Sequence, residues 1–147
     1  MPKIHKQVEY ARAGTEPALI CQMPSGWAVL CGMQYLPGYC ILLPDPVVPS
    51  LNALTREKRA EYLCDMAVIG DALLEVTDAF RINYAIMGNS DPALHAHIVP
   101  RYMGEPEKIC KQLPWDYPQD VMDDRCFDAD RDRVLIGKLA EAIKKRL

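Results

Sequence analysis

The chain has 147 residues, of which half are apolar and a quarter charged, and its formal net charge is −3. This length supports one hydrophobic core of ordinary size, so we expect a single globular domain over residues 1–147. The charge and the lack of a long Lys/Arg block argue against a nucleic-acid polymer as partner, because counterion release needs clustered cations. A small anionic ligand remains compatible with this composition.

No run approaches 18 apolar residues, and no apolar signal core follows the first residues. We therefore expect no membrane partner and a cytoplasmic location. The six cysteines are widely spread and include no Cys-x-x-Cys pair, which favours reduced thiols over disulfides or a structural zinc site.

The first part of the chain predicts a hairpin. Residues 1–18 have no strong periodicity and predict at most a short strand or an ordered arm. Residues 27–31 and 39–43 are apolar runs rich in aromatic and β-branched residues, and they predict two strands joined by the loop 32–38. Pro44, Pro46 and Pro49 then end the second strand.

A long helix is expected next, with Thr55 as N-cap and Glu57 in its first turn. Apolar and small residues recur at helical spacing, and acidic residues fall largely away from this stripe, which predicts core packing. The stripe consists of Leu63, Met66, Ala67, Gly70, Leu73, Leu74 and Thr77, and the acidic residues are Glu61, Asp65, Asp71, Glu75 and Asp78.

The second half predicts another hairpin and a terminal helix. Residues 82–87 alternate as a strand, and the turn-rich connection 88–93 leads to a second strand that ends at Pro100 and Arg101. Residues 103–127 are irregular and predict a wrapping segment. Acidic residues at 128–132 and basic residues at 144–146 flank an amphipathic pattern, which predicts a C-terminal helix.

The second strand carries His95 and His97, two of the three histidines in the chain. Because side chains alternate along a strand, both imidazoles should lie on one face, about 6.5 to 7 Å apart, with the small Ala93 beside them. Three interpretations are open at this point: a hydrogen-bonded structural pair, a metal site, or a nucleophile with a partner.

A metal site would need further ligands, yet only His5 remains, and Asp91 and Glu105 stand at no recognised ligand spacing. A nucleophilic imidazole instead needs one free nitrogen, so its other ring N–H requires an acceptor such as a backbone carbonyl. The carbonyl of Ala93 is available for that contact.

The segment Leu94-His95-Ala96-His97-Ile98-Val99-Pro100-Arg101 resembles the signature of the histidine triad (HIT) superfamily, in which three histidines alternate with apolar residues. The pattern Tyr35-Leu36-Pro37-Gly38-Tyr39 before an apolar strand, the long helix, and residues 82–89 match as well. The likeness spans about residues 26–102. It implies an α+β, HIT-like fold: an antiparallel sheet of about five strands, a long central helix and a C-terminal helix, with residues 103–147 as wrapping segment and helix.

The resemblance also implies roles for single residues. His95 becomes the middle histidine, which attacks the α-phosphate of a nucleotide phosphoramidate, ester or dinucleoside polyphosphate and forms a nucleotidyl-histidine intermediate. His97 becomes the last histidine, near the phosphate, and Asn89 matches a polar residue that contacts phosphate in relatives. Ala93 replaces the first histidine, while its carbonyl can still make the contact to His95 that relatives make at this position.

The resemblance also bears on the ribose contact, the class of enzyme and the oligomeric state. No acidic residue stands where relatives bind the ribose hydroxyls, near residues 31–34, so Gln34 is the candidate there. A His at position 97, rather than Gln, is typical of the hydrolases. The resemblance implies a bacterial-type nucleotide hydrolase that needs no cofactor or metal and forms a homodimer.

Two alternatives belong to other classes: a regulatory nucleotide-binding protein with little turnover, and a protein that binds metal through His95 and His97. Trp115 and Tyr117 either cover the site or serve ordinary packing.

Overall fold

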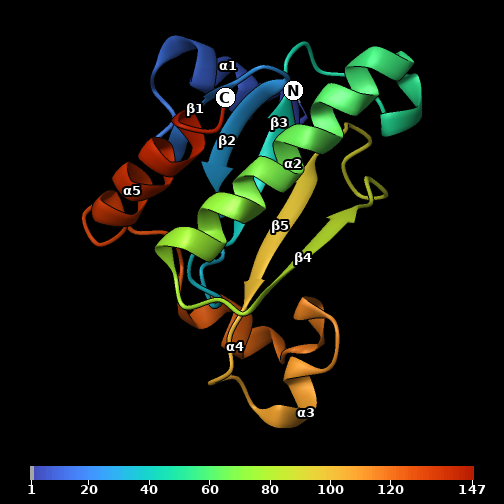
Figure 1. Cartoon of the computed structure of the whole chain (residues 1–147). Helices are drawn as coiled ribbons and strands as arrows, with labels where there is room; N and C mark the ends of the chain where they lie inside the picture. The colour runs from blue at the N-terminus through green and yellow to red at the C-terminus, as the bar shows by residue number, and fades with distance from the viewer. Residues whose placement is uncertain (1) are drawn as a thin grey trace.

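One five-stranded antiparallel sheet organises this computed structural model, which describes residues 2–147 (Figure 1). The strands lie in the order β1-β2-β3-β5-β4. Their bounds are β1 Leu19–Met23, β2 Gly26–Leu30, β3 Cys40–Pro44, β4 Arg81–Ile86 and β5 Ala96–Arg101. The predicted hairpins are confirmed, since β2 pairs with β3 and β4 pairs with β5, both antiparallel.

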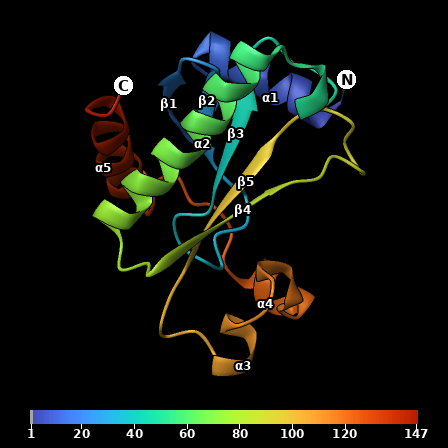
Figure 2. The ribbon, with the colours of Figure 1, turned by 45° about the vertical axis from the view of Figure 1, so that its right-hand side comes forward.

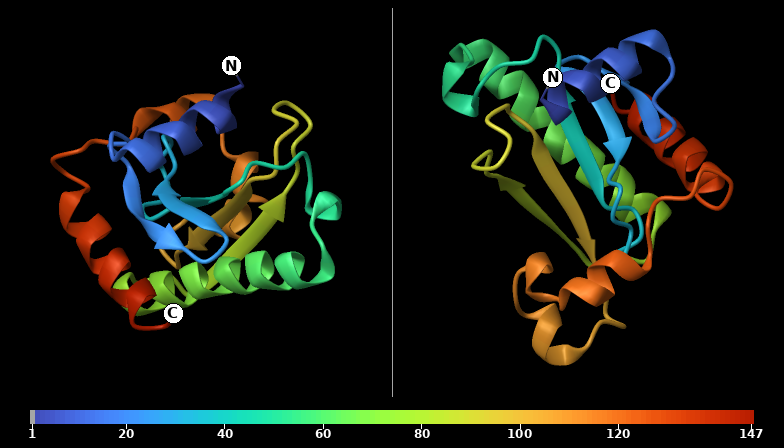
Figure 3. Two further views of the ribbon diagram at one scale, coloured as in Figure 1. Left: turned by 90° about the horizontal axis from the view of Figure 1, so that it is seen from above. Right: turned by 180° about the vertical axis from the view of Figure 1, so that it is seen from behind.

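Helices cover both faces of the sheet, as the view from above shows (Figure 3). The long α2 and α5 lie side by side on one face, and α1 lies on the other. Short helices and 3-10 turns complete the chain. The bounds are α1 Lys3–Ala13, η1 Leu51–Ala53, α2 Arg56–Val76, α3 Glu107–Cys110, η2 Pro114–Asp116, α4 Gln119–Asp124 and α5 Arg133–Lys144. The α+β fold with a long central and a C-terminal helix is therefore confirmed.

The alternation of side chains along the histidine strand divides the core. Ala96 and Ile98 belong to the cluster under α2 and α5, whereas Ala93 and Val99 belong to the cluster under α1. The predicted two-residue period is confirmed, and it places His97 on the α1 face. The regular strand begins only at Ala96, so residues 92–95 approach it as irregular backbone.

The expectation of a strand or arm at the N-terminus is wrong, because residues 3–13 form α1. Its buried residues, Ile4, Val8 and Ala11, follow a helical spacing and pack on the sheet. Gly14 ends the helix in the left-handed conformation at φ 73°. Strand β1 was not anticipated by the pattern of residues 19–23.

The helix α2 begins as predicted, with the Thr55 hydroxyl accepting from the Lys58 N–H at 3.2 Å. Its buried stripe is rotated from the predicted one, since Leu63 and Leu74 are exposed. Asp65, expected away from the core, is buried and accepts hydrogen bonds from Ser25, which offsets the cost of burial.

The wrapping segment holds α3, η2 and α4 at the end of the sheet where β5 finishes (Figure 2). All six cysteines are free thiols, as predicted. Among residues 2–147, no helix has both the length and the apolar character needed to cross a bilayer.

Candidate functional site

His95 and His97 lie together, with 5.1 Å between their ring centroids and an interplanar angle of 68°. Both line a cavity of about 610 Å³ on the α1 face of the sheet. The predicted common face of the two imidazoles is therefore present. The chemistry of each imidazole depends on the hydrogen-bond partner of its Nδ1 atom.

The Nδ1 atom of His95 is 2.8 Å from the carbonyl oxygen of Ala93. A carbonyl only accepts, so Nδ1 carries the proton of the neutral ring and Nε2 keeps its lone pair. Ala93 itself is buried and does not line the cavity. It acts on the site through its backbone.

His97 is enclosed by aromatic side chains. Its Nδ1 lies 2.6 Å from the hydroxyl of Tyr39, and the ring of Trp115 stands edge-on at 5.3 Å. Burial, followed by the charges of His95 and Lys3, lowers the pKa of His97 to about 4. The ring is therefore neutral at physiological pH.

The cavity walls come from segments far apart in the sequence. The helix α1 contributes Lys3, and the turn before β5 contributes Asp91. The backbone N–H of Ile4 donates to the Asp91 carboxylate at 3.0 Å, which fastens the start of α1 beside the histidines. Glu16 adds a second carboxylate to the lining, so one cation and two acids surround the site.

Two further predicted site residues can be placed, Asn89 and Gln34. Asn89 is exposed and lines the cavity. Gln34 does not line it: its amide donates to the carbonyls of Cys31 and Tyr39 and accepts from the Gly38 N–H. The structure therefore gives Gln34 the role of bracing the loop before β3, away from the predicted substrate contact.

Sequence reasoning missed Tyr39 and Lys3 as site residues and left Trp115 undecided. The signal for Lys3 was the spacing of apolar residues in α1, which would have placed a helix there. Tyr39 could be found only from the register of β3 against β5, which pairs Ile41 with His97.

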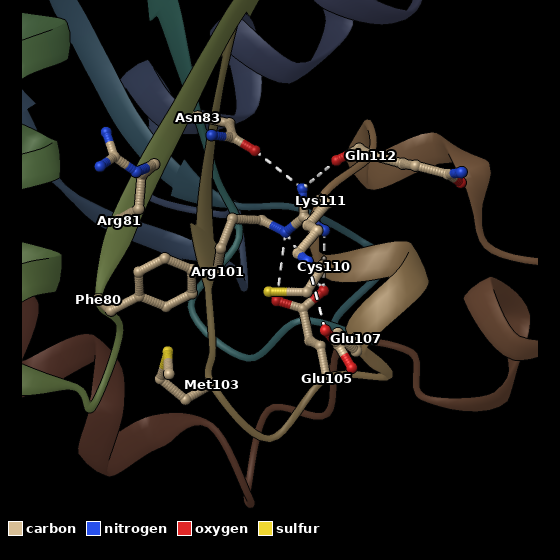
Figure 4. Close-up of a pocket in the computed structure, with 10 residues that line it drawn as sticks. All are labelled: Phe80, Arg81, Asn83, Arg101, Met103, Glu105, Glu107, Cys110, Lys111 and Gln112. Carbon is tan, nitrogen blue, oxygen red and sulfur yellow. Dashed lines mark hydrogen bonds and ion pairs between the residues drawn. The ribbon is translucent and has the colours of Figure 1, made fainter.

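Trp115 reaches His97 because Arg101 fastens the wrapping segment to the end of β5. The Arg101 guanidinium donates to Glu105, to Asn83 and to the carbonyl of Gln112, as Figure 4 shows. It also donates to the carbonyl of Ile109. Asn83, Arg101, Glu105 and Gln112 line a separate cavity of about 700 Å³. Burial works to raise the pKa of Glu105, but hydrogen bonds, first from Arg101, hold it below its usual value.

Among the described residues, the fold brings no third metal ligand to His95 and His97. Within the described residues 2–147, no group of three or more His, Cys, Asp and Glu side chains comes together in a geometry that could hold a metal ion. The third histidine, His5, is exposed on α1 and does not line the cavity.

The fold was compared with known proteins. No family model matches the chain, and no curated protein matches its sequence. Solved structures do match. A histidine triad protein from Bradyrhizobium japonicum is 24% identical with a TM-score of 0.69, and the match covers 89% of this chain and 95% of that one.

Two further structures extend the likeness. A histidine triad protein from Marinobacter aquaeolei is 18% identical with a TM-score of 0.71, covering 99% of this chain and 98% of that one. A hypothetical histidine triad nucleotide-binding protein from Sulfolobus tokodaii is 15% identical with a TM-score of 0.72, covering 95% and 92%. The chain described here has the fold of the histidine triad proteins.

Proposed function

We propose that this protein belongs to the nucleotide-binding and nucleotide-hydrolysing histidine triad superfamily and acts as a nucleotide hydrolase with His95 as nucleophile. The observation that carries the proposal is the hydrogen bond from His95 Nδ1 to the Ala93 carbonyl. It leaves Nε2 as a neutral nucleophile in a ring that lines the cavity. The missing first histidine does not remove this contact, because the acceptor is backbone.

In the proposed reaction, Nε2 of His95 attacks the α-phosphorus of a nucleotide phosphoramidate, ester or dinucleoside polyphosphate. A P–N bond forms, and the bond to the leaving group breaks with its electron pair on the leaving atom, which takes a proton from solvent water. Water then attacks the nucleotidyl-histidine, the P–N bond breaks, and a nucleoside monophosphate leaves. Asn89 and His97 are the proposed phosphate contacts.

The charges of the cavity favour one group of these substrates. Lys3 is the cation of the described lining, beside the carboxylates of Glu16 and Asp91. A chain of four phosphates would meet too little positive charge in this cavity. We therefore expect a phosphoramidate or ester of a nucleoside monophosphate to be turned over faster than a dinucleoside tetraphosphate.

The test is a substrate panel, run with chelator, on wild-type protein and His95→Ala. We expect turnover of at least one substrate, lowered by about four orders of magnitude or more in the variant. His5→Ala is the matched control, since His5 is exposed on α1 and lies outside the cavity lining.

Full activity in His95→Ala would contradict the mechanism. Tight binding of a nucleoside monophosphate by wild-type protein, without turnover of any substrate, would favour the regulatory nucleotide-binding protein. Loss of wild-type turnover on chelation would contradict catalysis without a metal. The homodimer is a proposal that rests on the resemblance, and light scattering of the purified protein would measure it. The cytoplasmic location is a proposal that rests on the apolar pattern of the sequence.

A further inference from the structure

We propose that Tyr39 is a positioning residue that fixes His97 as the neutral tautomer protonated at Nε2. His97 then offers an N–H donor to the phosphoryl group, while His95 offers a lone pair. The use of these two nitrogens in catalysis rests on the function proposed above, whereas the tautomers themselves follow from the contacts and are testable without any substrate.

The sheet register explains why Tyr39 meets His97. Ile41 of β3 is paired with His97 of β5, and Tyr39 precedes Ile41 by two residues, so both lie on the α1 face. A diagonal neighbour across two strands is within reach of an aromatic side chain. The Tyr39 ring lies 5.9 Å from the His97 ring, and its hydroxyl reaches Nδ1.

The hydroxyl of Tyr39 must be the donor in this contact. Tyr39 is fully buried, and burial raises its pKa far above the usual value, so the phenol keeps its proton. The Trp115 ring, which stands edge-on to His97, carries only an indole N–H donor and cannot accept the phenolic proton. Cys31, which packs against the same cluster as Tyr39, offers only a thiol, which is a weak acceptor, whereas a bare imidazole nitrogen is a good one.

The proton of the neutral His97 ring is then confined to Nε2. The alternative, with Nδ1–H of His97 donating to Tyr39, would leave a buried phenolic proton with only a thiol to accept it, at a cost of about 1–3 kcal/mol. Protonation of both nitrogens is opposed by burial, His95 and Lys3, the groups that lower the pKa of His97.

The two histidines of the site therefore have opposite tautomers. His95 is protonated at Nδ1 because Ala93 accepts there, and His97 is protonated at Nε2 because Tyr39 donates at Nδ1. One ring can form a bond to phosphorus, and the other can donate to a phosphoryl oxygen as its charge develops. Neither assignment requires the first histidine of the triad.

The experiment is ¹⁵N NMR of histidine-labelled wild-type protein at neutral pH. We expect the His97 Nε2 to be protonated and its Nδ1 to be unprotonated but hydrogen-bonded, with the reverse pattern in His95. A His97 ring protonated at Nδ1 would overturn the proposal. This measurement needs neither a variant nor turnover.

Substitution then tests the cause. In Tyr39→Phe, we expect the His97 Nδ1 to lose its hydrogen bond and the proton of the neutral ring to populate both nitrogens, because the donor to Nδ1 is gone, whereas burial, His95 and Lys3 still lower the pKa of His97. Tyr62→Phe is the matched control: Tyr62 is equally buried, and its hydroxyl donates to the Leu42 carbonyl at 2.7 Å on the other face of the sheet. It should leave the His97 signals unchanged.

Kinetic measurements distinguish a failure of the role of Tyr39 from a failure of the proposed hydrolase function. On any substrate that wild-type protein hydrolyses, Tyr39→Phe should lower kcat by about 10- to 100-fold with little change in KM. An unchanged His97 tautomer, with Nδ1 still unprotonated and hydrogen-bonded in Tyr39→Phe, would refute the role of Tyr39. Absence of wild-type turnover with the expected tautomers would refute the hydrolase and leave the role of Tyr39 standing.

Discussion

At the scale of single residues, the backbone carbonyl of Ala93 fixes the tautomer of His95 by accepting a hydrogen bond from its Nδ1. A side chain at position 93 is not required for this contact, since the acceptor belongs to the main chain. Ala93 is almost fully buried in the cluster that includes Ile4 and Val8 of α1. A small side chain at position 93 therefore leaves room for α1 to pack closely on the face of the sheet that carries His97.

The depressed pKa of His97 makes a prediction for stability. Between about pH 6.5 and pH 4, the unfolded chain binds a proton at this residue and the native protein does not, so the free energy of unfolding falls as the pH falls. The slope is at most about 1.4 kcal/mol per pH unit, and less for a ring that is only partly buried.

The comparison is wild-type protein with His97→Gln, unfolded by urea at pH 7, 6 and 5. Gln does not titrate, so the variant should lose this part of the pH dependence. An identical loss of stability with falling pH in the two proteins would show that His97 is not held neutral.

The sequence predicted the common face of His95 and His97, because the period of a strand is a local property. It could not predict the contact of Tyr39 with His97, because that depends on the register between strands that are more than fifty residues apart. Gln34 was misplaced for a related reason: its amide is used up by the loop that leads into β3.

At the scale of elements, the Arg101–Glu105 pair joins β5 to the wrapping segment, defined as residues 103–127. The side chains of Arg101 and Glu105 are almost fully buried, at 2% and 5% exposure. The guanidinium and the carboxylate each form several hydrogen bonds. Tyr117 donates to Glu105, and Tyr35 donates to the Pro114 carbonyl, so the residues around Trp115 are held at two points.

Arg101→Ala should lower the free energy of unfolding by about 3–5 kcal/mol, because it leaves the Glu105 carboxylate buried without its partner. Proteolysis within residues 103–127 should become faster in the same variant. Lys111→Ala removes an exposed ion pair with Glu107 in the same segment and should change stability by no more than about 0.5 kcal/mol. Equal stability losses in the two variants would contradict the role given to Arg101.

The elements also show which sequence signals are dependable. The helix α2 could be predicted because its sequence has an N-cap, sufficient length and helical periodicity. Its buried face differs from the predicted one, since Tyr62 and Ile69 lie in the core, whereas Leu63 and Leu74, which were expected there, are exposed. The helix α1 has only three buried residues among charged ones, so its pattern was overlooked.

At the scale of the whole molecule, α1 completes the site by covering the histidine face. Ile4→Ala should lower the free energy of unfolding by about 2–5 kcal/mol, since Ile4 is buried at 5% exposure in the cluster with Ala93 and Val99. KM should rise as well, because Ile4 and Lys3 line the cavity. Urea unfolding and steady-state kinetics measure the two effects.

Lys6→Ala, an exposed position on the same helix, is the control and should change neither quantity. A stable Ile4→Ala protein with unchanged KM would show that α1 is peripheral to the site.

The place of β5 between β3 and β4 has a consequence for motion. Amides of an interior strand exchange with solvent only when large parts of a protein open, so the segment that carries His97 belongs to the slowest-exchanging part of the molecule. Many binding sites are assembled from loops that fluctuate. Here His97 is anchored in this rigid strand and His95 directly precedes it, so the adjustments that admit a ligand fall to the turn before β5 and to the start of α1.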